Sequence, residues 1–419
     1  MVRTTVRGKL INSDNQIWRI MKTAFRDQAF DIYINYIRDT LVDILQTSSK
    51  LIQRQQLVDQ SNRTLVYQKS SSYRPSNPHC LGSVPPDISE SNREWKIPEL
   101  FVADVADVWL IGPAAVAVTN DGKYILENAV GKPEILMDSL VKSIYTGNIP
   151  VHQNTSPTFD SDPVANLSGA QSQAFFHWFV DYLPKIKAIE QYDDKYGRYP
   201  ELLIPRDPPD WLIDSLKLLD VPTEKINQRT ESRYHLGTLI IPFVPRHTSL
   251  TAPSGDFARS PQVLNWIANR LTDCVNQSES NKERILITRR DADSRRIYNE
   301  DEIITLLSDY GFTPVNLSTM SLRDQIKLFE STEYVIAPHG AGLTNIIYAS
   351  NINVLEIFGD FVSPIYYQIA AGLGHEYSFI QCDDIKSSDN KSIVESRDNR
   401  DILVNKEKII RIMQKYWDM

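Results

Sequence analysis

The fold is decided by residues Tyr334–Asn345, which read YVIAPHGAGLTN. A short apolar strand ends in a tight turn with two glycines, and a helical pattern over residues 341–349 follows directly. Such a run is typical of a buried strand in a parallel sheet. Gly340 and Gly342 let backbone N–H groups approach a bound anion, and the new helix points its positive end at it. Glycines that serve only close packing are the alternative, because Gly-x-Gly alone is a weak signal.

The same alternation of strand and helix continues on both sides of this turn. Strands are predicted at residues 285–288, 313–316, 334–337, 354–358 and 377–381, and helices at 300–310, 321–329, 341–349 and 363–371. A second set lies upstream, with apolar runs at 108–118, 124–126, 201–204 and 239–244 around helices at 174–191 and 211–219. Strands separated by helical crossovers predict parallel, doubly wound sheets. We therefore expect an α/β fold with two Rossmann-type domains that face a cleft.

Changes in composition give the expected domain boundaries. An apolar spacing of three to four residues predicts a helix over residues 14–57, whereas Ser, Pro and Asn accumulate from 69 to 98. We predict a helical N-terminal extension (1–67), a linker or loop (68–98), a first α/β domain (99–260), a second, Rossmann-like domain (261–385), and a C-terminal loop and helix that pack back on the first domain (386–419).

Charge and cysteine content limit the classes of protein. The chain has 419 residues and a net charge of -8, which argues against broad nucleic-acid binding. Its three cysteines lie far apart, which favours a reduced compartment, and no apolar run approaches the length of a membrane span. Acidic and basic residues balance in the 14–57 helix, so we expect it to dock on the protein or form a homo-oligomer, with a membrane surface as the alternative. A cytoplasmic protein, at most peripheral to a membrane, is predicted.

Four arginines occur within residues 289–296 of this acidic chain. The strand before them delivers Thr288 and Arg289 at its carboxyl end, where open α/β sheets bind ligands. Guanidinium groups match phosphate oxygens bidentately, so a diphosphate is the natural partner. The alternative is a solvated loop whose charge is neutralised by Asp291, Asp293 and Glu300.

Glu356 lies within the apolar strand 354–358, where an unpartnered carboxylate is costly to bury. Either it accepts hydrogen bonds from a ribose or sugar hydroxyl, or it pairs with an arginine such as Arg289. Upstream, His177 and Asp181 are four residues apart and share one helix face. They could supply the base that deprotonates an acceptor hydroxyl, or they could form an intrahelical hydrogen bond.

Two Asp-x-Asp triplets, at 160–162 and 291–293, have the spacing of a metal–diphosphate motif. Arginines flank the second triplet and could neutralise a diphosphate without a cation. We therefore predict neither a metal nor another cofactor.

In their order along the chain, these motifs resemble glycosyltransferase family 61. The stretches that carry the resemblance are 177–184, 288–300, 338–345 and 355–356, within residues 100–385. The resemblance implies a GT-B fold, a nucleotide-sugar donor that is commonly UDP-linked, and inverting transfer without an obligatory metal. Microbial members look like enzymes of capsular or other surface-polysaccharide assembly. The chain departs from the family at Gln173-Ala174, where an Asn often precedes the His, so the acceptor side is less well matched than the donor side.

The expected function is transfer of a sugar from a nucleotide-sugar donor to a polysaccharide or glycoconjugate hydroxyl. Asp181 is the first choice for the base, and His177 the second. The expected donor-binding residues are Thr288, Arg289, Arg296, Asn299, Glu300, His339, Gly340, Ala341, Gly342, Thr344, Asn345 and Glu356. A non-catalytic component of a polysaccharide-assembly complex is the alternative. A nicotinamide-dependent enzyme is disfavoured because the glycine fingerprint of a dinucleotide domain is missing.

Overall fold

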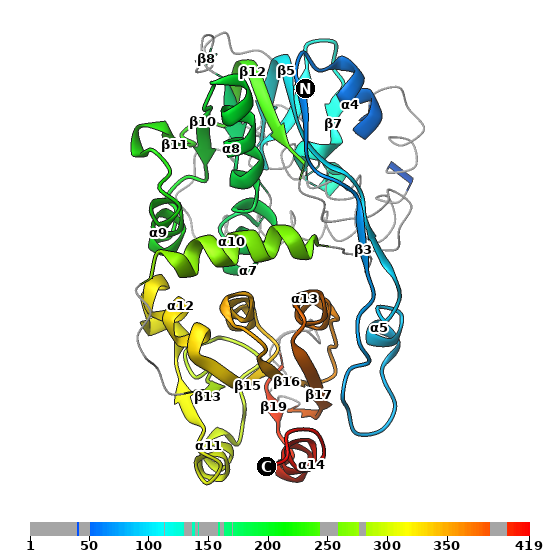
Figure 1. Ribbon diagram of the computed structural model, residues 1–419, viewed down its shortest axis with the longest axis vertical. Helices are drawn as coiled ribbons and strands as arrows, with labels where there is room; N and C mark the ends of the chain where they lie inside the picture. The colour runs from blue at the N-terminus through cyan, green and yellow to red at the C-terminus, as the bar shows by residue number, and fades with distance from the viewer. Residues whose placement is uncertain are drawn as a thin grey trace, which may run out of the picture.

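The computed structural model describes residues 51–112, 114–129, 158–159, 163–169, 171–243, 259–275, 282–385 and 400–419, with short pieces at 40–41, 136–138 and 141. Two β-sheets lie at opposite ends of the molecule, and helix α10 (Pro261–Asp273) crosses between them (Figure 1). The predicted helix of residues 14–57 lies outside the described residues over 14–39 and 42–50. No helix in the described part of the chain is both long and apolar enough to cross a bilayer.

The second sheet has five parallel strands in the order β14-β13-β15-β16-β17. Their bounds are Glu283–Ile287 for β13, Thr313–Val315 for β14, Thr332–Pro338 for β15, Asn353–Phe358 for β16 and Glu376–Gln381 for β17. The five predicted strands are thus confirmed. Ile285, Leu286 and Ile287 are all buried, because helices cover both faces of the sheet.

The crossover helices lie on both faces of this sheet (Figure 1). They are α11 (Glu300–Ser308), α12 (Leu322–Ser331), the 3₁₀ helix η6 (Ala341–Tyr348) and α13 (Ile365–Leu373). On the face toward α10 lie α12, η6 and α13, and α11 lies on the other. The sequence places Ser321 as the cap of α12, and its hydroxyl accepts a hydrogen bond from the backbone N–H of Asp324 at 3.2 Å.

The C-terminal helix α14 (Lys406–Tyr416) also covers the second sheet. Its buried residues Ile409, Ile412 and Met413 share one apolar cluster with Leu286 and Ile336. The prediction that this helix packs back on the first domain is wrong. Helices α11 and α14 share one face of the second sheet, and the apolar side of α14 covers the part of that face that α11 leaves open.

The first sheet is mixed, in the order β1-β7-β6-β5-β12-β9-β10-β11. Strands β9 (Val164–Asn166), β10 (Glu201–Ile204) and β11 (Ile226–Gln228) are parallel, and β12 (Arg233–Pro242) runs parallel to β9. The long strand β5 (Leu100–Ile111) is antiparallel to both β12 and β6 (Val116–Thr119), and β6 is antiparallel to β7 (Tyr124–Ile125). The predicted doubly wound sheet therefore fails at β5–β7. Strands β5 and β6 pair as an antiparallel hairpin, because the residues between them are too few for a helical crossover.

The expected N-terminal extension enters the first sheet near its end. Strand β1 (Leu51–Ile52) pairs with β7, helix α4 spans Arg54–Gln60, and β2 (Thr64–Gln68) pairs with β5. Residues 51–67 thus belong to the first domain.

The expected linker of residues 68–98 is structured as well. Strands β3 (Ser71–Tyr73) and β4 (Trp95–Ile97) pair with each other, and α5 (Pro86–Ser89) lies beside the second domain (Figure 1). The backbone of His79 bonds to Tyr377 O at 2.9 Å and to Phe379 N at 3.0 Å, along the edge of β17. This segment therefore connects the two sheets on one side of the molecule.

One hydrophobic cluster joins the two domains. It contains Leu264 and Ile267 of α10 together with Ile186 from the first domain and Val335 from the second. Because α10 contacts α8 (Lys185–Tyr196) on one side and α12, α13 and η6 on the other, the elements that carry the predicted motifs are held at a common boundary.

Candidate functional site

The predicted donor residues lie at the point where the strand order of the second sheet reverses. Strands β13 and β15 are neighbours, and the chain leaves them in opposite directions, to β14 and to β16. In open parallel sheets, ligands bind at the carboxyl ends of the strands beside such a switch point. Thr288 and Arg289 follow β13, whereas His339 and Gly340 follow β15. The structure therefore brings the arginine loop and the glycine turn together.

The guanidinium of Arg289 lies against the glycine turn. A Cβ atom on Gly340 would be 2.2 Å from Nη1 of Arg289, so the guanidinium occupies the space that another side chain would need. With a φ of 171°, Gly340 has an extended backbone that any residue adopts, so a larger residue here would have to displace the guanidinium, which is the end of a flexible side chain. Burial and the neighbouring cation of Arg295 lower the pKa of Arg289. An anion bound here would favour the charged guanidinium and so counteract both the burial of Arg289 and its repulsion by Arg295.

The N-terminal end of η6 faces the same place. Its first N–H groups have no partner within the helix, and their dipoles favour an anion. Gly342 lies in close contact with β13, because its Cβ would be 3.3 Å from Cγ2 of Ile287. Thr344 and Asn345 are buried, and Nδ2 of Asn345 donates to Gly342 O and to Oε1 of Gln325, both at 3.1 Å. The first turn of η6 is thus fixed relative to the arginine loop.

Glu356 positions His339, and both of its carboxylate oxygens are engaged within the protein. The Nδ1 atom of His339 lies 2.5 Å from Oε1 of Glu356, and the hydroxyl of Tyr377 donates to Oε2 at 2.5 Å. Glu356 has 0% exposure. Neither expectation for this residue, a sugar hydroxyl or an arginine partner, agrees with these contacts. The buried carboxylate instead fixes the ring of His339, which leaves only Nε2 for another group.

Three other expected donor residues are engaged by side chains or backbone of the protein, and two of them, Arg296 and Asn299, hold the C-terminal segment. Arg296 pairs with Asp401 (Nη2 to Oδ2, 2.7 Å), and the side chain of Asn299 bonds to both the N–H and the C=O of Val404 at 3.0 Å. Glu300 pairs with Arg290. These contacts explain all three side chains without a ligand.

On the first domain, His177 and Asp181 form the expected pair. Helix α7 (Phe175–His177) continues into a π-helical turn, Trp178–Tyr182, in which Leu183 N bonds to Trp178 O at 2.8 Å. Such turns occur frequently at functional sites. Nδ1 of His177 is 2.7 Å from Oδ2 of Asp181.

Arg259 donates a hydrogen bond to the other carboxylate oxygen of Asp181. Its Nε donates to Oδ1 at 3.3 Å, and its own side chain is buried. The side chain of Asp181 is 1% exposed, against 14% for His177. The carboxylate is therefore engaged and enclosed, and the imidazole is the more accessible member of the pair.

Tyr366 of α13 connects the two clusters. Its ring packs edge-on against Phe176 at 5.6 Å and lies 5.4 Å from the ring of His339. Sequence reasoning missed Tyr366, Arg259 and Arg295. Arg295 lay inside the quoted arginine cluster, but nothing in the spacing of Tyr366 or Arg259 separates them from core or loop residues.

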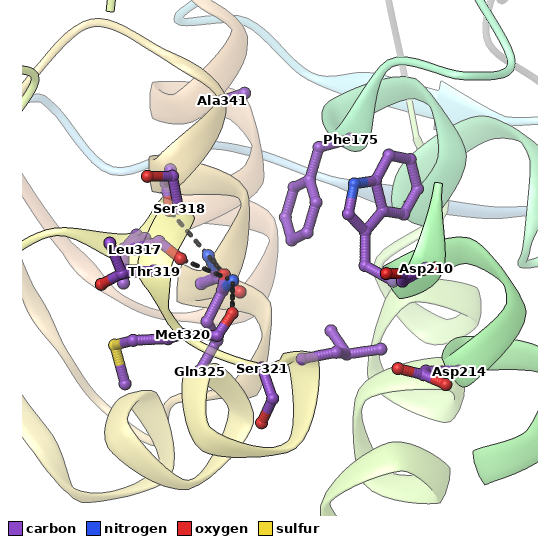
Figure 2. A pocket seen from close by; sticks show the side chains of 14 residues that line it. Phe175, Asp210, Asp214, Leu317, Ser318, Thr319, Met320, Ser321, Gln325 and Ala341 are labelled. Atoms are coloured by element: carbon purple, nitrogen blue, oxygen red, sulfur yellow. Dashed lines mark hydrogen bonds between the residues drawn. The ribbon is translucent and has the colours of Figure 1, made fainter. Parts of the chain in front are cut away.

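A cavity of about 640 Å³ opens beside this junction, between the two domains. Figure 2 shows its two walls: Phe175, Asp210 and Asp214 on the first domain, and the turn Leu317–Ser321 on the second. Trp211 lies in the first wall, with its ring 5.2 Å from that of Phe175. Ala341, Gly342 and Asn345 complete the lining. Sequence reasoning predicted the helices at both walls but not their meeting across a cavity.

Metal ligands do not gather in this part of the molecule. Across the residues that the structure describes, no group of three His, Cys, Asp or Glu side chains could hold a metal ion. The three cysteines are free.

The comparisons with known proteins bear on the segment that carries both clusters. The family model of Glycosyltransferase 61 matches residues 175–354, from Phe175 of α7 to Val354 of β16. A beta-1,2-xylosyltransferase of Arabidopsis thaliana is 30% identical over 149 residues, which cover 32% of this chain and 26% of that relative. The chain thus matches about a quarter of the relative's length. Both findings support the glycosyltransferase class, and specifically family 61, for this segment.

Two solved structures are similar at a TM-score of 0.26. One is the dodecameric iron-containing heptosyltransferase TibC in complex with ADP-D-beta-D-heptose, at 9% identity over 52% of this chain and 66% of that chain. The other is TibC from enterotoxigenic E. coli, at 10% identity over 66% and 74%. At this TM-score neither structure bears on the fold or the function of this chain.

Proposed function

We propose that the protein is an inverting glycosyltransferase of GT-B type, which moves a sugar from a nucleotide-sugar donor to a hydroxyl group of a polysaccharide or glycoconjugate. The observation that carries the proposal is the meeting of Arg289, the Gly340 turn and the N-terminal end of η6 at a switch point. Across Tyr366, this anion site faces a His–Asp pair. A diphosphate leaving group and a base are what sugar transfer needs.

His177 is the base in this proposal, in place of our first choice, Asp181. The carboxylate of Asp181 accepts from Nδ1 of His177 and holds that tautomer, so that Nε2 can take a proton. The acceptor oxygen forms a bond to the anomeric carbon as Nε2 removes its proton. The bond from that carbon to the diphosphate oxygen breaks in the same displacement, which inverts the configuration.

The leaving diphosphate takes the electron pair of the broken bond and gains negative charge. Arg289, the N–H groups of η6 and, with the imidazole doubly protonated, the Nε2–H of His339 are fixed before the reaction, which is the arrangement that stabilises developing charge most effectively. The same proposal includes three further details: the donor is UDP-linked, the transfer needs no metal, and the acceptor is a surface polysaccharide.

Thermal-shift screening of the purified full chain with nucleotide sugars tests this function, because a ligand that binds the native state raises the melting temperature with its concentration. We expect a shift with at least one nucleotide sugar and with its nucleoside diphosphate, followed by hydrolysis or transfer. No shift and no hydrolysis across UDP-, GDP-, CMP- and ADP-linked sugars would contradict the proposal. A shift without turnover on any acceptor would instead favour a binding component of a polysaccharide-assembly complex.

A further inference from the structure

Lys185 is a buried cation that the chemistry proposed above does not use. It is the first residue of α8, and it is 6% exposed. Its ammonium group donates to Asn166 O at 3.3 Å and lies 5.0 Å from the centre of the Tyr182 ring. A carbonyl oxygen and a ring face compensate only part of the cost of burying a charge. Buried cations of this kind gather at functional sites.

The charge that acts on Lys185 is the carboxylate of Asp181, four residues earlier. Leu183 and Pro184 have helical backbone angles, so the π-helical turn continues into α8 and places residues 181 and 185 on one face. Burial lowers the pKa of Lys185 to about 8, and the carboxylate of Asp181 acts in the opposite direction. Lys185 therefore carries its charge below about pH 8 and loses it above.

The His177–Asp181 pair thus has two cations beside it. Nε of Arg259 donates to Oδ1 of Asp181 at 3.3 Å, and Lys185 lies on the helix that follows. A carboxylate by itself raises the pKa of an imidazole bonded to it, and a protonated imidazole is no base. Two cations offset the charge of Asp181 and favour the neutral ring.

Four other titratable or charged groups surround this part of the molecule. Tyr366 on α13 and Tyr73 on β3 stay neutral near pH 7, because burial raises the pKa of both phenols. Arg229 donates to the loop that follows β9, and Glu127 is paired with an arginine of α4. Burial raises the pKa of Glu127 to about 7. Because this carboxyl also titrates near neutral pH, the test needs a direct readout of His177.

We propose that Lys185 is a positioning residue that lowers the proton affinity of His177 through Asp181, and so keeps the base unprotonated near neutral pH. The inference rests on the proposed function, which names His177 as the base. A neighbouring charge shifts a pKa by about one to three pH units, and Lys185 acts from behind Asp181. Loss of its charge should therefore raise the pKa of His177 by about one.

NMR titration of the full chain labelled with ¹⁵N-histidine measures this pKa directly. The chain has seven histidines, and His177→Gln identifies the signal of residue 177. Lys185→Met, which keeps the length of the side chain and removes its charge, should raise the pKa of His177 by about one. Lys185→Arg keeps a cation and should retain the wild-type value. If Lys185→Met does not fold, Lys185→Gln removes the charge and still donates to Asn166 O.

Lys187→Met is the matched control. It makes the same substitution two residues further along α8, at a half-buried lysine whose ammonium group lies 5.8 Å from the Trp266 ring. The pKa of His177 should be unchanged in this variant. An equal rise in Lys187→Met and Lys185→Met would overturn the inference.

The pH dependence of kcat for transfer is the second readout. In Lys185→Met, kcat should fall on the acid side at a pH about one unit higher than in the wild type. Above pH 8 the two profiles should converge, because the wild type has then lost the charge of Lys185 as well. The same loss of kcat at every pH would show that Lys185 acts only in packing, and would overturn the inference.

The outcomes separate this inference from the proposed function. An unchanged pKa of His177 in Lys185→Met overturns the inference, whereas transfer by the wild type still supports the proposed function. A raised pKa in a protein that neither binds nor hydrolyses any nucleotide sugar confirms the coupling between Lys185 and His177 and contradicts the proposed function.

Discussion

The imidazole of His339, just after β15, and the carboxylate of Glu356, within the neighbouring parallel strand β16, are 2.5 Å apart from Nδ1 to Oε1. The carboxylate is fully buried, and Tyr377 binds its second oxygen. A histidine held in this way has a fixed ring and leaves Nε2 as its one ring nitrogen for another group.

Glu356→Gln should therefore lower kcat for transfer about tenfold or more, because the amide oxygen can still accept from Nδ1 but lacks the negative charge that a carboxylate places beside the imidazole. Steady-state kinetics with the donor that the screen identifies measures this. Tyr377→Phe is the control, since it removes the other hydrogen bond to Glu356 and leaves His339 paired. Equal effects of the two substitutions, at equal melting temperatures, would show that Glu356 acts only in the core.

His177→Ala should lower kcat by about two to four orders of magnitude, the usual contribution of a general base, while donor affinity stays unchanged. Asp181→Asn should lower kcat less, because the amide oxygen still accepts from Nδ1 of His177. Single-turnover rates and donor titrations of both variants measure these effects. If Asp181→Asn abolished transfer and His177→Ala retained it, the two roles would have to be exchanged.

Gly340→Ala should weaken UDP binding by displacing Arg289, since the added methyl group would lie 2.2 Å from Nη1. The backbone there suits alanine, so the fold should persist with little change in melting temperature. A double-mutant cycle separates the two effects. In the Arg289→Ala background, Gly340→Ala should cost little further affinity. A full additional loss would mean that Gly340 acts through its own backbone contact with the ligand.

His375 should make the fold sensitive to acid. It is buried, its Nε2 lies 3.0 Å from Ile346 O, and burial lowers its pKa to about 4. Its ordinary pKa is about 6.5, so the unfolded chain takes up the proton first as the pH falls. Stability is therefore present above about pH 6.5 and is lost toward pH 4.

The size of that loss is measurable by urea unfolding at pH 7.5 and 4.5. Between these values the wild type should lose about 2–3 kcal/mol more than His375→Gln. Parallel curves for the two proteins would show that this histidine does not titrate in this range.

The sequence predicts individual helices and strands better than it predicts which other elements they pair with or pack against. The runs at 201–204 and 354–358 are short, apolar and bounded by turns, and both are strands with nearly the predicted bounds. The connection 112–115 was misread, because an apolar run from 108 to 118 does not reveal a hairpin in its middle. The apolar stripe of α14 could cover either sheet, and only the packing decides.

Prediction of the site residues has the same limit, because local sequence does not reveal contacts with distant segments. Arg289 and Gly340 were predictable because each follows a strand, and parallel strands bring their carboxyl ends to one edge. Arg296 looks equivalent in sequence, yet it pairs with Asp401, which lies far along the chain. Trp211 and the turn 317–321 meet only because α9 (Asp210–Leu218) and α12 pack together across the domain boundary, and no local pattern encodes that.

The central claim, an anion site for the donor diphosphate at Arg289, is tested most directly by titrating UDP into the wild type, Arg289→Ala and Arg296→Ala. The structure holds Arg289 against the glycine turn and Arg296 against Asp401. We therefore predict at least a tenfold increase in the Kd of UDP for Arg289→Ala and an unchanged Kd for Arg296→Ala. An unchanged Kd for Arg289→Ala, or the same loss in both variants, would contradict the account.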